Sequence, residues 1–237
     1  MENDAYLLGM GDYVDVASPS NRARIKAADL YDGVLGALDE IGEQYVEKFL
    51  RLTKGTHGRW LGFLGGHHYH DFGDGTTSDT RIAEALGAPY LGSCAFLRVK
   101  FSRPNSARRL ACTIWCHHGA GGGVRVSSPL NKLDNIMRCF DADIYLIGHQ
   151  HKKVAAPMQQ LYMTKKEPHH LGYHTKFIAC TGGYLRGYLQ GSKVGNIPTG
   201  SYVEKWMLPP TALGGIKIHI EPKMRHRETD LKIEVTL

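Results

Sequence analysis

Two short runs rich in histidine each follow an apolar stretch of the chain. The first run is Cys116–Gly119, after Leu110–Trp115, and the second is Gly148–His151, after Asp143–Ile147. The apolar stretches predict buried strands. If these strands are parallel neighbours, their imidazoles meet at one edge of a sheet, where open α/β sheets usually bind ligands. Neutral imidazole is the commonest protein ligand for transition metals. The pattern therefore predicts a metal centre at the carboxyl edge of a sheet.

Two earlier loops repeat this arrangement of an apolar run followed by polar side chains. Ala5–Met10 leads into Gly11 and Asp12, and Trp60–Leu64 leads into the glycine- and histidine-rich loop Gly65–His68. A carboxylate can bridge or bind a hard cation, whereas imidazoles hold manganese, iron or zinc. Such an ion lowers the pKa of bound water and neutralises charge on a phosphoryl oxygen. The four loops together predict hydrolytic metal chemistry.

The remaining sequence supplies the elements that would position these loops. We expect one α/β domain over residues 1–237, with a β-rich and mainly antiparallel final third. Ser78 is the expected cap of a short helix that runs to Leu86. Helices are expected at Asn21–Leu52 and Asn131–Phe140, and further strands at Ala95–Phe101, Phe177–Cys180, Ile216–Ile220 and Leu231–Val235, with a turn at Arg103–Ser106.

Composition sets the broad class. Hydrophobic residues make up 42% of the chain and charged residues 22%, which is ordinary for a globular protein. The N-terminus does not have the pattern of a secretory signal. The five cysteines are an odd number and favour a reducing, cytoplasmic compartment. Cys112 and Cys116 lie four apart, so they could form a zinc pair, but buried free thiols are the preferred interpretation. The net charge of +6 permits a nucleic-acid partner, although a solvated basic surface is slightly favoured.

With these motifs in place, the chain resembles the calcineurin-like metallophosphoesterases. The resemblance runs from Ala5 to at least His151, and Ser201–Lys205 and Pro209–Gly214 resemble the tail of phage-type members. It implies a β-sandwich flanked by helices in four αββα layers, and a location in host cytoplasm if the chain is phage-encoded. It also implies that His67 contacts the phosphate or protonates the leaving group. The implied metal ligands are Asp12, His117, His149 and His151, with His118 a weaker alternative to His117.

The chain also departs from the family pattern. The family's Asp-x-His loop after its first strand has no counterpart before Asp12, so the chain is expected to start inside the family's domain. Gly66 stands where the family has an asparagine ligand. His68 or His70 could replace that ligand, or this loop could be a solvated turn. Loss of the first strand would expose a sheet edge, which predicts marginal stability or self-association.

Other residues have two interpretations each. Gly119–Gly123 resembles a phosphate-binding loop but lacks the usual Gly-Lys-Ser/Thr ending, and the preferred interpretation is that it lets the backbone pass close to the metal site or the substrate. Arg125 is a weak candidate for substrate binding, because single arginines near glycine loops usually lie at the surface. His169, His170 and His174 could form a lid, although a solvated loop is favoured. Asp15 could orient a histidine or cap the following helix.

The favoured function is a metal-dependent phosphoesterase with Mn, Fe, Zn or Ni at one or two sites, acting on a phosphomonoester, a phosphodiester or nucleic acid. Asp12 and His67 are the candidate catalytic side chains. The alternative is a truncated, inactive relative that serves as a binding module.

Overall fold

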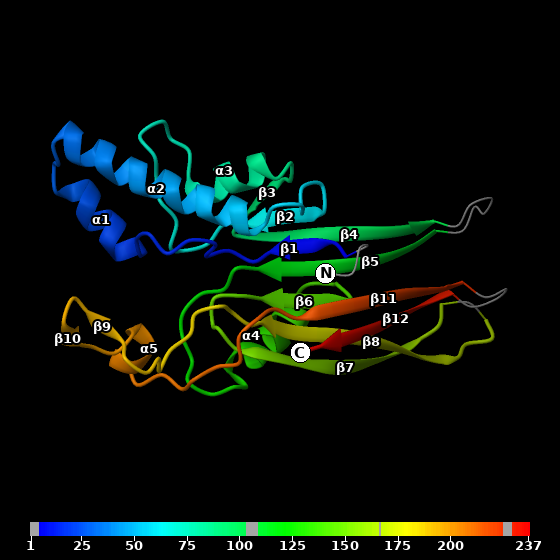
Figure 1. Cartoon of the computed structure of the whole chain (residues 1–237). Helices are drawn as coiled ribbons and strands as arrows, with labels where there is room; N and C mark the ends of the chain where they lie inside the picture. Colours follow the sequence, from blue (N-terminus) through cyan, green and yellow to red (C-terminus); the bar gives the residue numbers. More distant parts are fainter. Residues whose placement is uncertain (1–4, 103–108, 166, 225–228) are drawn as a thin grey trace. The chain divides into compact units, whose positions relative to one another are not determined.

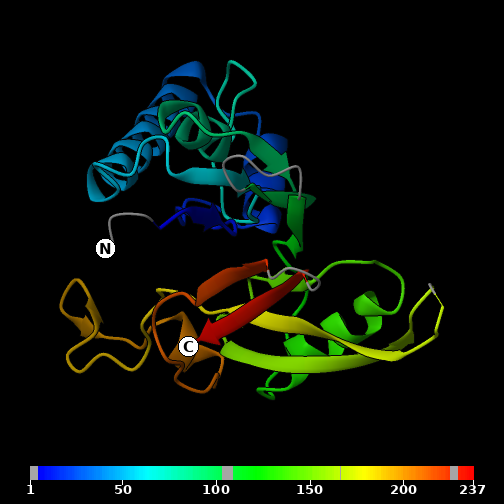
Figure 2. The same cartoon turned by 90° about the vertical axis from the view of Figure 1, so that its right-hand side faces the viewer.

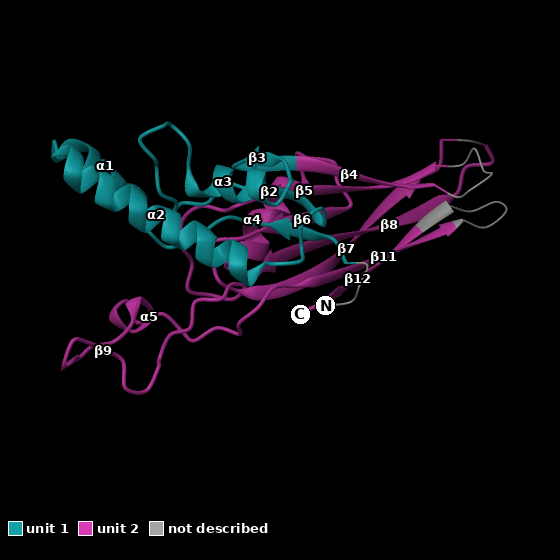
Figure 3. Cartoon of the chain, turned by 45° about the horizontal axis from the view of Figure 1, so that its top comes forward, with its two compact units in different colours: residues 1–95 teal, residues 96–237 magenta. Residues whose placement is uncertain are grey.

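The computed structural model describes residues 5–102, 109–165, 167–224 and 229–237. The chain divides into two compact units, residues 1–95 and residues 96–237, which are coloured separately in Figure 3. The turn expected at Arg103–Ser106 lies outside the described residues. The expectation of one domain over the whole chain is not tested by this division and stays a prediction. The chain is a mixed α/β protein, and each unit has its own sheet.

The first unit contains a parallel sheet of three short strands in the order β1-β2-β3. These strands are β1 (Leu7–Gly9), β2 (Trp60–Leu64) and β3 (Tyr90–Gly92). Parallel neighbours need a crossover connection, and helices supply it: α1 (Pro19–Ala27) and α2 (Asp32–Leu52) precede β2, and α3 (Ser78–Ala85) precedes β3. The strands expected at 5–10 and 60–64 are thereby confirmed.

The expected helical region 21–52 is two helices rather than one. Asp29 has a left-handed backbone with φ of 47°, which ends α1, and Tyr31 is the N-cap of α2. The apolar face of α2 is also less buried than its helical periodicity predicts. Val46 is buried against Phe63 in the core of this unit, whereas Val34 and Ile41 are each more than two-fifths exposed.

The helix α3 begins one residue earlier than expected. Thr77, not Ser78, is its N-cap: the Thr77 hydroxyl accepts a hydrogen bond from the backbone N–H of Thr80 at 3.2 Å. The Thr80 hydroxyl in turn bonds the backbone N–H of Thr77 at 2.9 Å, which completes a capping box. Ser78 is the first helical residue, and its hydroxyl instead accepts the backbone N–H of His70 at 3.1 Å.

The second unit is built on a five-stranded sheet in the order β4-β5-β6-β8-β7 (Figure 1). Its centre is parallel, with β6 hydrogen-bonded between β5 and β8, and β7 is antiparallel at one edge. The helix α4 (Ser128–Met137) packs on this sheet through Leu133, which is fully buried. The strands are β4 (Cys94–Ser102), β5 (Arg109–His117), β6 (Ile144–Ile147), β7 (Lys153–Met163) and β8 (Leu171–Thr181).

The final third is β-rich, as expected, but only partly antiparallel. The pairs β7–β8 and β11–β12 are antiparallel. On its other side β8 is parallel to β6, so the expected antiparallel pairing of Phe177–Cys180 holds toward β7 but not toward β6. Figure 2 shows β11 and β12, in orange and red, as a hairpin of their own. The remaining elements are β9 (Lys193–Val194), β10 (Ile197–Pro198), α5 (Tyr202–Lys205), β11 (Lys217–Met224) and β12 (Thr229–Thr236).

The cysteines behave as the sequence predicts. All five lie in described residues and none of them forms a disulfide, and Cys112 and Cys116 are fully buried in β5. Burial raises the pKa of the Cys112 thiol to about 12. A thiol this hard to ionise is a core side chain rather than a reactive one.

Candidate functional site

In the first unit, the loop after β1 is joined to the loop after β2 through the side chain of Asp12. Gly11 and Asp12 both have left-handed backbones, with φ of 93° and 54°. The Asp12 carboxylate oxygen Oδ1 accepts hydrogen bonds from the backbone N–H groups of His67 at 2.5 Å and His68 at 3.0 Å. The structure thus brings together two of the predicted site residues, Asp12 and His67. It also gives Asp12 a folding role, because the carboxylate orders the backbone that carries His67.

Gly66 is a glycine because Asp12 leaves no room for a side chain. A Cβ placed on Gly66 would lie only 2.8 Å from the Asp12 Cα and even closer to the Asp12 backbone nitrogen and Oδ1. The Gly66 N–H also donates to Oδ2 of the buried Asp79 at 2.8 Å. An asparagine at this position would therefore have to displace the Asp12 loop. From the sequence alone, Asp79 is only an acidic residue in the first turn of α3, and nothing there predicts its hydrogen bond to Gly66.

The other two histidines of this loop are each held by a carboxylate. Nδ1 of His68 lies 2.8 Å from Asp15 Oδ1, and this hydrogen bond raises the pKa of His68. The expectation that Asp15 orients a histidine is thereby confirmed, and the cap of α1 is Ser18 instead. Nε2 of His70 lies 2.7 Å from Asp39 on α2, which ties the His70 ring to a helix.

In the second unit, the loops after β5 and β6 lie side by side. The register pairs His117 with Ile147, so both strands end together at the carboxyl edge. The rings of His118 and His149 meet edge to face, with centroids 5.1 Å apart. One ring nitrogen of each lies within 4.8 Å of the other, a spacing that one metal ion could bridge. His118 is 2% exposed, so the pair is shielded from solvent on that side.

His117 has a different environment from its neighbour. Its Nδ1 accepts a hydrogen bond from the backbone N–H of Gly119 at 2.7 Å. Burial, followed by the nearby His118, lowers the pKa of His117. With Nδ1 accepting this hydrogen bond, a neutral ring carries its proton on Nε2, so neither nitrogen presents a free lone pair in this arrangement. The geometry favours His118 over His117 as the partner of His149, and a ligand role for His117 stays a prediction.

The backbone is strained at the candidate ligands. In the part of the chain that the structure describes, six non-glycine residues have positive φ, and three of them are Asp12, His149 (61°) and His151 (52°). Such conformations cost on the order of 1–3 kcal/mol each and tend to persist at functional sites. Gly119, with φ of 110°, allows the two loops to approach, because a Cβ there would lie 2.9 Å from the Gly148 carbonyl oxygen.

The structure also locates Arg125 and the histidines near residue 170. Arg125 is exposed on the loop before α4. His169, His170 and His174 do not lie in one loop, so the favoured solvated loop is wrong for His174, and a lid made of all three does not fit either. His174 lies within β8, where its Nε2 bonds Asp143 at 2.8 Å. His169 and His170 lie at the turn between β7 and β8. These strands have 11 residues each, so the turn is roughly 35 Å from their ends near His151 at 3.3 Å per residue.

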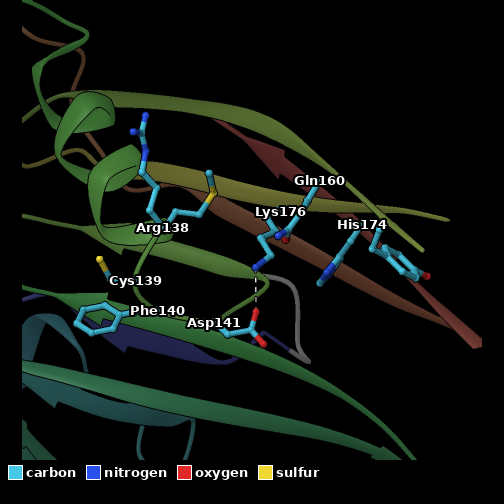
Figure 4. A pocket seen from close by; sticks show the side chains of 9 residues that line it. Arg138, Cys139, Phe140, Asp141, Gln160, His174 and Lys176 are labelled. Carbon is cyan, nitrogen blue, oxygen red and sulfur yellow. Dashed lines mark hydrogen bonds and ion pairs between the residues drawn. The ribbon is translucent and has the colours of Figure 1, made fainter. Parts of the chain in front are cut away.

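A separate hollow of about 440 Å³ lies beside the end of α4 and contains none of the predicted ligands (Figure 4). Lys176 projects into it from β8 and bonds Asp141 at 2.9 Å. Burial alone would lower the pKa of Lys176, but the hydrogen bond to Asp141 outweighs it, and the pKa is raised. The lysine is thus a paired cation. Its charge is already matched by a carboxylate, so the hollow has no evident chemistry of its own.

No family model matches the chain, and no curated protein does. Among solved structures, the chain is similar to Vps29 from Entamoeba histolytica, crystallised as a complex with zinc. The sequences are 12% identical, the alignment covers 78% of this chain and 88% of that chain, and the TM-score is 0.35. A likeness this weak supports no argument about function. None of the helices in the described residues is long and apolar enough to cross a membrane.

Proposed function

We propose that the chain is a metal-dependent phosphoesterase related to the calcineurin-like enzymes, with the four-layer arrangement of that family. The observation that carries the proposal is the packing of His118 against His149 at the carboxyl ends of two parallel strands. One buried and one half-buried imidazole in this position suit Mn, Fe, Zn or Ni better than a purely hard cation. A divalent ion bound there would activate water and neutralise charge on a phosphoryl oxygen.

Each of these side chains has a role in the proposed mechanism. His118 and His149 hold the ion, and His151 is a further ligand from the same loop. Asp12 and His67 are required for turnover: the Asp12 carboxylate fixes the backbone of His67, whose imidazole protonates the leaving oxygen. The natural substrate is a phosphomonoester, a phosphodiester or nucleic acid, and the net charge of +6 suits such polyanions.

The test uses hydrolysis of bis-p-nitrophenyl phosphate and direct metal titration of the same samples. We expect Mn²⁺- or Zn²⁺-dependent turnover that is lost in Asp12→Ala. We expect His118→Gln and His149→Gln to weaken metal binding about tenfold or more. His117→Gln is the matched control and should bind metal nearly as the parent does. Equal losses in His117→Gln and His118→Gln would refute the assignment of His118.

One observation favours a second function, metal binding without hydrolysis. Gly66 is packed against Asp12, so the amide ligand that the family uses has no space in this chain. Metal binding that depends on His118 and His149, in a folded protein with no turnover on mono- or diesters, would support this function over the first.

A further inference from the structure

The loop that carries His149 contains a buried amide with no bonding partner. Gln150 is 8% exposed, and both its Nε2 and its Oε1 are fully buried. No residue in the described part of the chain lies within hydrogen-bonding distance of either atom. Buried polar groups in native proteins are nearly always bonded to protein, water or a ligand. We therefore expect the partner of this amide to lie outside the described residues.

The amide lies beside the first turn of α4. A Cβ placed on Gly123 would be 2.6 Å from the Ser128 hydroxyl oxygen and 3.9 Å from Gln150 Oε1, so Gly123 lies between the amide and the start of the helix. The cap residue Ser127 makes no side-chain hydrogen bond to the described first turn. A ten-residue helix has the positive end of its dipole here, and such ends bind phosphate and other anions.

The segments that carry the amide and the helix start have only positive charges. The segments 117–133 and 148–152 contain three lysines and arginines and no aspartate or glutamate. Two of the lysines hold the loop itself: Lys152 Nζ donates to the Gly123 carbonyl, and Lys132 Nζ donates to the Ala120 carbonyl at 2.6 Å. A cation would be repelled here, whereas an anion would be attracted by both the lysines and the helix end.

We propose that the loop 119–127, the start of α4, Gln150 and Lys152 form a binding site for a phosphate group that does not require the metal. Gln150 Nε2, the lysine and the backbone of the helix start are the donors. Gly122 has open space where a side chain would be, and Gly121 has a left-handed backbone. If the proposed function is right, this site would hold a second phosphate of a polyphosphorylated substrate or of a nucleic-acid chain.

The test measures binding of inorganic phosphate to the full chain by calorimetry, with EDTA present and ionic strength held constant with chloride. We expect saturable binding by the parent. Gln150→Leu should weaken phosphate binding at least about tenfold, because the amide donor is lost, and Lys152→Met should weaken it as much because the charged donor is lost. Gln159→Leu and Lys153→Met are the matched controls, and each should stay within about twofold of the parent.

The variants are readily checked for folding. Gln150→Leu removes a buried polar group without a partner, so its melting temperature should equal or exceed that of the parent. Gln150→Glu keeps the shape and adds a negative charge, and it should abolish phosphate binding. Absence of binding by the parent, or equal binding by parent and Gln150→Leu, would show that an internal water completes the amide and would overturn the proposal. Binding that appears only when metal is added would overturn this site but support the metal centre.

Discussion

The sharpest prediction concerns Gly66, where even one methyl group is too much. In Gly66→Ala, the new Cβ overlaps the Asp12 backbone nitrogen, Cα and carboxylate oxygen, and the two backbone atoms cannot turn away as a side chain can. The Asp12 loop must therefore move away. That movement breaks the hydrogen bonds by which Asp12 Oδ1 accepts the N–H groups of His67 and His68.

The size of the effect follows from those two bonds. A hydrogen bond to a charged group contributes about 1.5–3 kcal/mol, so loss of both costs about 3–6 kcal/mol. Alanine restricts the unfolded chain more than glycine does, and this effect alone stabilises the folded protein by about 0.4–1 kcal/mol. Since Gly66 does not have a positive φ, backbone strain adds nothing. The net loss of about 2–5 kcal/mol is a large part of the roughly 5–15 kcal/mol that stabilises a typical domain.

The assay is urea unfolding followed by tryptophan fluorescence, since Trp60 lies in β2 of the same unit. The control is Gly36→Ala in α2, where a Cβ would meet no atom within 4 Å. This substitution in a helix should stabilise the protein by about 0.5–1 kcal/mol. If Gly66→Ala unfolds within about 0.5 kcal/mol of the parent, the packing of Asp12 on Gly66 does not have the role described.

Three other measurements test the charged groups and thiols. The Asp15 hydrogen bond raises the pKa of His68, so the pair contributes stability below the ordinary histidine pKa and loses it as pH rises through the raised one. Asp15→Asn should lower the His68 pKa in an NMR titration; an unchanged value would contradict the contact. For Asp143, burial raises the pKa, but hydrogen bonds to the carboxylate lower it further than burial raises it. Its stability contribution is present above the ordinary carboxyl pKa and disappears as pH falls through the lowered one. Asp143→Asn should cost about 1–3 kcal/mol near neutral pH and flatten the acid limb of a stability–pH curve. Finally, a thiol reagent should modify only the exposed Cys94 and Cys139 in the native protein and all five cysteines after unfolding; rapid native reaction of a third would contradict the burial.

The sequence predicts best where one local signal decides the structure. The bounds of β2 follow from the apolar run Trp60–Leu64, and the ends of β5 and β6 at their histidines follow from the same kind of pattern. The polar loops at these strand ends were therefore predictable. Which of His117 and His118 is the better candidate ligand could not be predicted, because the answer depends on a backbone N–H from Gly119 that only the folded loop presents.

Other elements are decided by tertiary context. The strand β7 was missed because Pro157 and the mixed pattern of Lys153–Met163 argue against a strand. Pro157 is tolerated because β7 lies at the edge of its sheet, where a residue without an N–H can face outward. Likewise, the sequence shows that Gly66 cannot bind a metal, but only the structure shows why a larger residue would not fit.

The hydrogen bonds that Asp12 accepts have a consequence for how relatives of this chain should be compared. Selection to preserve folding would retain this aspartate even in a lineage that had lost all turnover, because its carboxylate organises the neighbouring loop. Covariation between position 12 and position 66 would then record steric fit rather than chemistry. In an alignment, variation at positions 118 and 149 would separate active from inactive descendants better than the presence of the aspartate.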